Sequence, residues 1–131
     1  MQRSLLWARH SAAHVMDALI LRVGIEPENV DDVIWGCVSQ VGSQAANLGR
    51  NVVLSSERLP ISVPGTTVDR QCGSSQQALH FAAQAVMSGT QDIVVAGEEG
   101  TEMFIMLKGE AAVLAKDQNE TVLANLTTPG Q

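Results

Sequence analysis

Cys72 stands where the sequence predicts that a strand ends and a helix begins. Residues 66–68 are β-branched, which favours a strand, and residues 74–87 place apolar side chains on one helical face. The unpaired N–H groups and the positive dipole end of a helix stabilise an anion at its start. For a thiol this favours the thiolate, which is the nucleophilic form, so Cys72 is a candidate for nucleophilic catalysis.

The residues that follow Cys72 fit the same chemistry. Gly73 lets a bound group approach the backbone closely, and we expect Ser74 or Ser75 to cap the helix. The position of Cys72 alone does not distinguish a catalytic role from a packing role, because a small buried cysteine packed at a turn would occupy the same place.

Helical and extended segments alternate along the chain. We expect helices at about 11–23, 48–56 and 74–87, and strands at 33–38, 66–68 and 92–96. The run at 33–38 is apolar without alternation, as expected for a strand that is covered on both faces. This order predicts an α/β fold, a doubly wound layer with a largely parallel sheet.

The helix at 11–23 is expected to be amphipathic and to end at Gly24, which suits a left-handed C-cap. Its apolar face is predicted to consist of Ala12, Val15, Met16, Leu19, Ile20 and Val23.

The sequence around Cys72 resembles that of a known family. Residues 63–78, VPGTTVDRQCGSSQQA, closely resemble the active-site segment of thiolases. Four other segments are similar to the same family: 30–38 (VDDVIWGCV), 47–51 (NLGRN), 83–89 (AQAVMSG) and 92–97 (DIVVAG). The resemblance covers about residues 11–103, and it favours the catalytic interpretation of Cys72 over the packing one.

The resemblance implies a thiolase-like half-domain, an α/β fold with helices layered around a mixed, largely parallel sheet. We expect residues 1–103 to form a partial, incomplete N-terminal thiolase domain. Residues 104–131 are then a divergent C-terminal tail, in which 105–116 can form a helix.

The resemblance also implies an acyl-CoA acyltransferase activity. Cys72 would attack an acyl thioester and carry the acyl group, in thiolytic cleavage or in Claisen condensation. The backbone N–H of Cys72 would belong to an oxyanion hole. The substrate would be a coenzyme A thioester, and no cofactor or metal is expected to be bound.

The later catalytic motifs of thiolases, a Gly-His-Pro segment, a second cysteine and an Asn-containing loop, do not occur in this sequence. We therefore expect little activity from the chain alone, because a thiolate without a base cannot readily complete turnover. The alternative is a non-catalytic, truncated thiolase homologue that pairs with a full-length subunit through the strand at 66–68, or forms a homo-oligomer. A ketoacyl synthase and a redox-active thiol are further alternatives for Cys72.

Other candidate residues have simpler explanations. His10, His14 and Asp17 have a spacing that can hold a metal, but a solvated helix end accounts for them. Cys37 is expected in the core, and His80 is not expected to act as the base. Glu98, Glu99 and Glu102 are expected to form a solvated loop.

Composition limits the partners. The net charge of −6 argues against a nucleic-acid surface, which needs clustered Lys and Arg. Asp17 and Arg22 interrupt the apolar stretch at 15–23, which argues against a membrane span. Two cysteines are too few for a disulfide scaffold, so we expect a reducing compartment, the cytoplasm.

Overall fold

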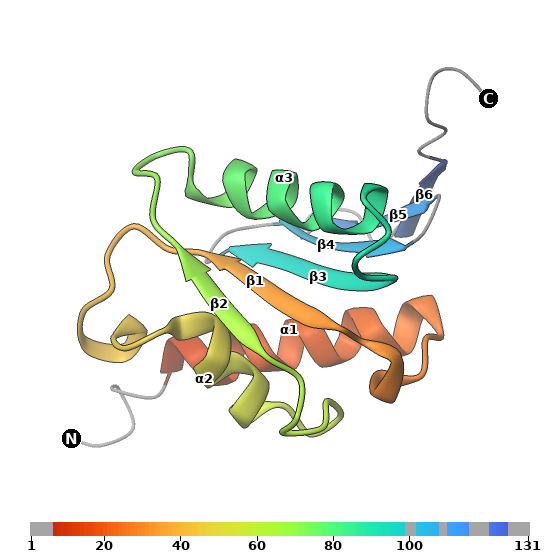
Figure 1. Cartoon of the computed structure of the whole chain (residues 1–131). Coiled ribbons are helices and arrows are strands. Elements are labelled where there is room, and N and C mark those ends of the chain that lie inside the picture. Colours follow the sequence, from red (N-terminus) through yellow and green to blue (C-terminus); the bar gives the residue numbers. More distant parts are fainter. Residues whose placement is uncertain (1–6, 99–101, 108–109, 116–120, 126–131) are drawn as a thin grey trace.

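The computed structural model describes residues 7–98, 102–107, 110–115 and 121–125 (Figure 1). Its helices are α1 (Trp7–Val23), α2 (Leu48–Ser55) and α3 (Ser74–Met87), with short 3-10 turns η2 (Pro27–Asn29) and η3 (Gly42–Gln44). Its strands are β1 (Asp32–Gly36), β2 (Gly65–Val68), β3 (Ile93–Glu98), β4 (Glu102–Leu107), β5 (Glu110–Ala115) and β6 (Thr121–Asn125). The strands form one sheet in the order β2-β1-β3-β4-β5-β6.

The sheet is mixed. β1 lies in the middle of its parallel part and pairs with β2 on one side and β3 on the other. β4, β5 and β6 then extend the sheet by antiparallel pairing. The predicted α/β fold with helices layered around a mixed sheet is therefore confirmed. The sheet was expected to be largely parallel, but parallel pairing is limited to β2, β1 and β3.

The prediction of a helix at 105–116 is wrong. Residues 105–107 belong to β4 and residues 110–115 to β5, and the two strands pair with each other from Leu107 with Glu110 to Glu102 with Ala115. The sequence does carry a signal for this arrangement, because Lys108 and Gly109 separate two apolar runs by a spacing typical of a hairpin. β4 also pairs with β3, and the spacing of apolar residues along the sequence cannot reveal such pairing.

Helices cover both faces of the parallel part of the sheet. Figure 1 shows α1 and α2 on one face and α3 on the other. The central position of β1 explains why residues 33–35 are apolar without alternation: Val33 and Trp35 face the first side, and Ile34 faces α3. Both predictions, the strand and its burial on both faces, are confirmed.

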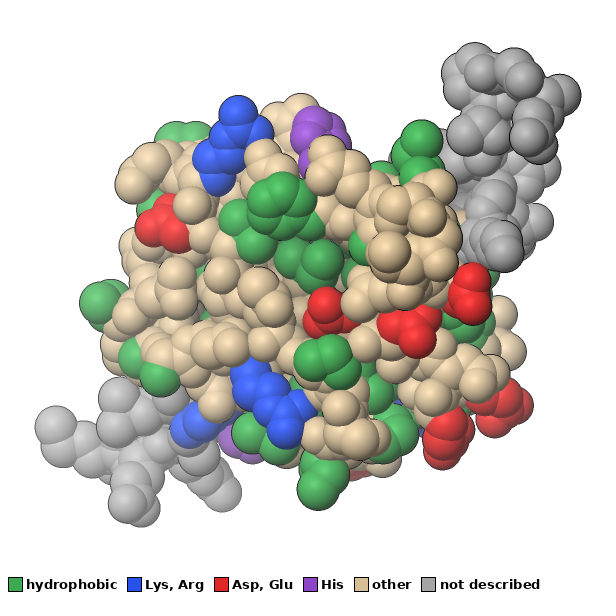
Figure 2. Space-filling view, viewed as in Figure 1, with side chains coloured by type: hydrophobic (Ala, Val, Ile, Leu, Met, Phe, Trp, Pro, Cys, Tyr) green, Lys and Arg blue, Asp and Glu red, His purple; other side chains and the backbone are tan. Residues whose placement is uncertain are grey.

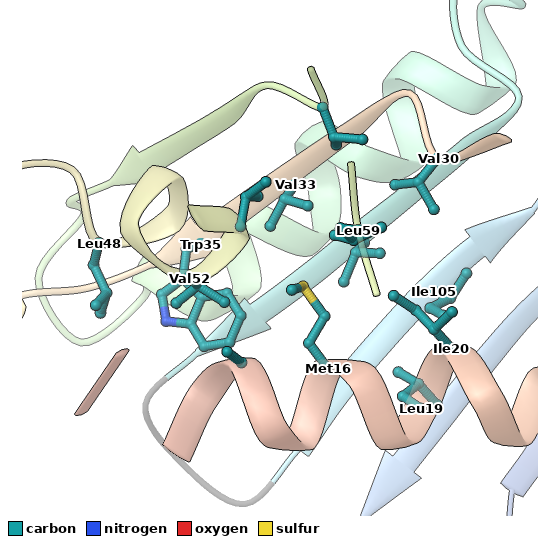
Figure 3. Packing of buried hydrophobic residues seen from close by; sticks show 14 of the residues in the cluster. Met16, Leu19, Ile20, Val30, Val33, Trp35, Leu48, Val52, Leu59 and Ile105 are labelled. Atoms are coloured by element: carbon teal, nitrogen blue, oxygen red, sulfur yellow. The ribbon is translucent and has the colours of Figure 1, made fainter. Parts of the chain in front are cut away.

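Two hydrophobic clusters result. The larger one lies on the α1 and α2 side, and its members include Met16, Leu19, Ile20, Val33, Trp35, Leu48, Val52, Val53, Val95 and Ile105 (Figure 3). The smaller one lies under α3 and consists of Ile34, Ala78, Ala82, Val86, Val94 and Ala96. The outer side of α3 leaves Phe81 and Met87 exposed, and Figure 2 shows hydrophobic side chains at the surface in this region.

α1 ends as predicted but starts earlier and turns a slightly different face inward. Gly24 has φ of +74°, and its N–H donates to Ile20 O at 3.0 Å, which closes the helix. Met16, Leu19 and Ile20 are buried as expected, but Val15 is 41% exposed. Ala8 and Ala13 are buried in its place, so the buried stripe is shifted.

A network of hydrogen bonds attaches α2 to β2. Asn47 Oδ1 accepts from Arg50 N and from Thr67 Oγ1, and Asn47 Nδ2 donates to Gly65 O at 2.9 Å. Gly49 N donates to Thr67 Oγ1 at 2.9 Å. These contacts fix β2, the strand that leads directly into the turn with Cys72.

Candidate active site

Cys72 lies in the turn between β2 and α3, and its side chain is exposed. β2 ends at Val68 and α3 begins at Ser74, so the predicted position of Cys72 between a strand and a helix is confirmed. The competing explanation, a small cysteine buried in the packing of this turn, is therefore wrong, because the side chain of Cys72 is exposed.

The turn before Cys72 closes through its own backbone. Gly73 N–H donates to Arg70 O at 3.0 Å, and Ser74 N–H donates to Gln71 O at 3.1 Å. Gln71 has φ of +49°, a left-handed conformation that costs free energy for a residue with a Cβ. Its N–H donates to Asp69 Oδ1 at 2.9 Å. The residue directly before Cys72 is therefore held in an unfavourable backbone conformation by local hydrogen bonds.

Ser74 joins the two ends of this turn. Its Oγ accepts from Arg70 N at 2.8 Å and donates to Gln71 O at 2.7 Å. The prediction that Ser74 or Ser75 caps α3 is wrong, because the N-cap is Gly73 and no side chain caps the helix. Ser74 uses its hydroxyl on the turn before the helix instead, which leaves the N–H groups of the first helical turn without a side-chain cap.

The start of α3 lies directly against the end of β1. A Cβ placed on Gly36 would be 2.5 Å from Ser75 N and 2.6 Å from Ser74 C, a distance that real Cβ atoms do not show. Only glycine allows this approach. The contact fixes where α3 begins, and with it the positive end of the helix dipole that Cys72 precedes.

Arg70 and Cys72 belong to the same turn. The guanidinium of Arg70 donates through Nη1 to Gln77 Oε1, which keeps this charge beside the first turns of α3. No hydrogen bond joins the N–H of Cys72 to another residue in the described part of the chain.

Comparison with known proteins assigns the family. The family model described as "Thiolase, N-terminal domain" matches residues 2–124. The chain belongs to the thiolase family. The match contains β2, the Cys72 turn and α3, and it continues through the antiparallel strands β4 and β5.

Several curated thiolases are similar to this chain. The steroid 3-ketoacyl-CoA thiolase FadA6 of Mycobacterium tuberculosis is 58% identical over 79 residues, which are 60% of this chain and 19% of FadA6. The 3-ketoacyl-CoA thiolase of Erwinia tasmaniensis is 49% identical over 83 residues, or 63% of this chain and 21% of the relative. That of Pectobacterium carotovorum is 44% identical over 91 residues, or 69% and 23%. This thiolase-family chain thus spans about a fifth of the length of these relatives.

The second cysteine of this thiolase-family chain lies in the core. Cys37 is buried, and its Sγ donates to Gln44 Oε1 at 3.2 Å. Its N–H donates to Val68 O at 3.0 Å, which extends the pairing of β1 with β2. The expectation that Cys37 packs in the interior is confirmed.

His10, His14 and Asp17 line an open hollow of about 600 Å³ between α1 and the residues that follow α2. The carboxylate of Asp17 accepts from Ser56 Oγ and from Glu57 N–H, the latter at 2.9 Å, so it ties this loop to α1. Among the residues that the structure describes, no three His, Cys, Asp or Glu side chains come together at a metal-binding distance. The hollow lies on the opposite face of the sheet from α3 (Figure 1).

The remaining candidates are placed as follows. His80 is exposed on α3, two turns after Cys72. Glu98 and Glu102 belong to β3 and β4, so the expectation of a loop is wrong for these two residues. Their side chains, and all of Glu99, lie outside the described residues. None of the helices in the described ranges has the length and hydropathy of a membrane span.

Sequence reasoning found Cys72 and named Ser74 with the wrong partner, but it missed two residues that shape the surroundings of Cys72: Gly36 and Gln71. Gly36 is the last residue of β1, and a glycine within an apolar strand is a signal of close backbone approach that could have been used. No comparable signal marks Gln71, because glutamine rarely adopts positive φ.

Proposed function

We propose that the chain performs the acyl-transfer chemistry of a thiolase on Cys72, with an acyl-CoA as the substrate. The observation that carries this proposal is the exposed thiol at the start of α3 in a thiolase-family chain. The names of the relatives support 3-ketoacyl-CoA as the substrate class. The direction is either thiolytic cleavage or Claisen condensation, in acyl-CoA metabolism.

The proposed reaction starts with the thiolate of Cys72, which attacks the carbonyl carbon of the thioester. A new C–S bond to Cys72 forms, and the bond to the sulfur of coenzyme A breaks. Coenzyme A leaves as a thiolate and takes up a proton from solvent. With a 3-ketoacyl-CoA the thiolate attacks the C3 carbonyl carbon instead, the C2–C3 bond breaks, and the carbanion of the departing acetyl-CoA takes up the proton. The Cys72 N–H donates to the carbonyl oxygen as negative charge develops on it, an interaction that can lower the barrier by about 3–4 kcal/mol.

Turnover needs a base, and the histidines of this chain are poorly placed for that role. His10 and His14 lie on α1, on the opposite side of the sheet from α3, and His80 is exposed two turns along α3. We therefore expect one acyl group to accumulate on each chain, with little release.

Mass spectrometry tests this proposal. The 131-residue chain is incubated with acetyl-CoA or with a 3-ketoacyl-CoA, and the intact mass and a peptide map are recorded. We expect one added acyl group on the peptide that contains Cys72, no addition to the Cys72→Ala variant, and an unchanged yield for Cys37→Ala. Acylation of Cys72→Ala to the same extent as the unchanged chain, or no acylation at all, would refute the proposal.

A second candidate function is that of a non-catalytic partner that pairs with a full-length thiolase or with another copy of itself. β2 favours it, because in the described part of the chain this strand has a neighbour, β1, on one side only. An unpaired strand edge is a template for another strand.

Co-purification tests this second candidate. The chain and a tagged full-length relative, such as FadA6, are expressed together and passed over an affinity column. If β2 forms the contact, Thr66→Lys removes the co-purification, because Thr66 is exposed on that strand and a charge at a strand edge opposes pairing. Ser11→Lys, at an exposed position on α1 and so outside the sheet, should leave it unchanged. Equal recovery of both variants would argue against pairing through β2.

A further inference from the structure

We infer that Ser74 is a positioning residue for Cys72, an inference that rests on the proposed acyl transfer and deepens it. Ser74 is the only buried residue with a polar side chain in the described ranges, and 4% of its surface is exposed. A serine is buried at this level when its hydroxyl has partners, and Ser74 Oγ has two. Both partners belong to the turn that carries Cys72.

The two partners lie on either side of one strained residue. Arg70 N–H precedes Gln71 in the chain, and the other partner is the carbonyl oxygen of Gln71 itself. By accepting from one and donating to the other, the Ser74 hydroxyl holds Gln71 at φ of +49°. Without the hydroxyl, the turn can relax toward the negative φ values that glutamine prefers.

Relaxation of Gln71 would move Cys72, because the two residues share a peptide bond. The thiol and the N–H of Cys72 would then change direction relative to the start of α3. Displacement of a reacting group by about 1 Å can lower a rate by about a hundredfold. The fold would change little, because Arg70 and Gln71 are exposed and water can replace the lost partner.

The first test compares Ser74→Ala with Ser75→Ala, a neighbour whose hydroxyl has no hydrogen bond to a described residue. We expect Ser74→Ala to lower the rate of Cys72 acylation by acetyl-CoA about tenfold or more, and Ser75→Ala to leave it within about twofold. Thermal unfolding followed by circular dichroism is expected to differ by only a few degrees between the two variants.

Rescue distinguishes positioning from a general structural role. Asparagine adopts positive φ more readily than glutamine, so Gln71→Asn in the Ser74→Ala background is expected to recover several-fold of the lost rate. A serine that merely supported the fold would give no such recovery.

A second pair of variants covers the case in which Ser74→Ala fails to fold. Gln71 is exposed, so Gln71→Val cannot damage the core, but a β-branched residue strongly resists positive φ. Gln71→Val should therefore react about tenfold more slowly than Gln71→Asn. Equal rates for these two variants, or for Ser74→Ala and Ser75→Ala, would overturn the inference.

Alkylation by iodoacetamide separates this inference from the proposed function. The reagent reports access and nucleophilicity of Cys72 without any need for an acyl-CoA. If acetyl-CoA does not acylate the unchanged chain, the proposed function fails, and the order of alkylation rates among the variants still decides the role of Ser74.

Discussion

Replacement of Trp35 by alanine is expected to lower the free energy of unfolding by about 3–5 kcal/mol. Trp35 is fully buried and lies on β1 among residues of α1 and α2, including Met16, Leu48 and Val52 (Figure 3). The ring also fills the space above Gly97, where an added Cβ would come within 2.6 Å of it. Truncation would leave a large cavity between both helices and the sheet. Urea unfolding followed by circular dichroism measures the change.

Two variants serve as controls for this experiment. Trp7→Ala removes the other tryptophan, which is 65% exposed at the start of α1, and is expected to change stability by less than about 0.5 kcal/mol. Trp35→Phe should lose much less stability than Trp35→Ala, because a ring remains and the buried Nε1, which has no hydrogen-bond partner among the described residues, is removed. A loss below about 1 kcal/mol for Trp35→Ala would contradict this packing of the tryptophan ring.

The parallel part of the fold could be predicted because its signals are local. β-branched runs, a glycine after a helix and apolar residues at helical spacing marked β1, β2, β3 and all three helices within a few residues. β4 and β5 have no such periodic signal, because their residues are apolar without a clear period. Apart from the spacing of the two runs around Lys108 and Gly109, what makes them strands is their pairing with β3 and with each other.

The position of Cys72 could be predicted, and the geometry of its turn could not. A cysteine between a strand and a helix is visible in the sequence, but its orientation depends on the left-handed backbone of Gln71. That conformation runs against the preference of glutamine and exists because Asp69 and Ser74 hold it. A serine at the start of a helix usually caps that helix, so the sequence predicted that Ser74 would bond to the first turn of α3. Its hydroxyl bonds to the preceding turn instead.

Gly36→Ala is expected to damage both the fold and the reactivity of Cys72. The new Cβ would lie 2.5 Å from Ser75 N and 2.6 Å from Ser74 C, and these are backbone atoms that cannot turn aside. The start of α3 must therefore move away from β1, at a cost of about 1–3 kcal/mol in the free energy of unfolding. The same movement displaces Ser74 and the turn that it closes, so we expect Cys72 to be alkylated by iodoacetamide several-fold more slowly.

Gly73→Ala is the matched control for stability, because it makes the same chemical change on the other side of the α3 start. Gly73 has φ of −103°, which alanine can adopt, and a Cβ there would meet only Arg70 O at 3.5 Å and the Arg70 side chain at 3.9 Å. Its free energy of unfolding should stay within about 0.5 kcal/mol of the unchanged chain. Equal stabilities for Gly36→Ala and Gly73→Ala would mean that α3 does not rest on the end of β1. An unchanged alkylation rate in a destabilised Gly36→Ala would mean that the Cys72 turn keeps its geometry independently of where the helix begins.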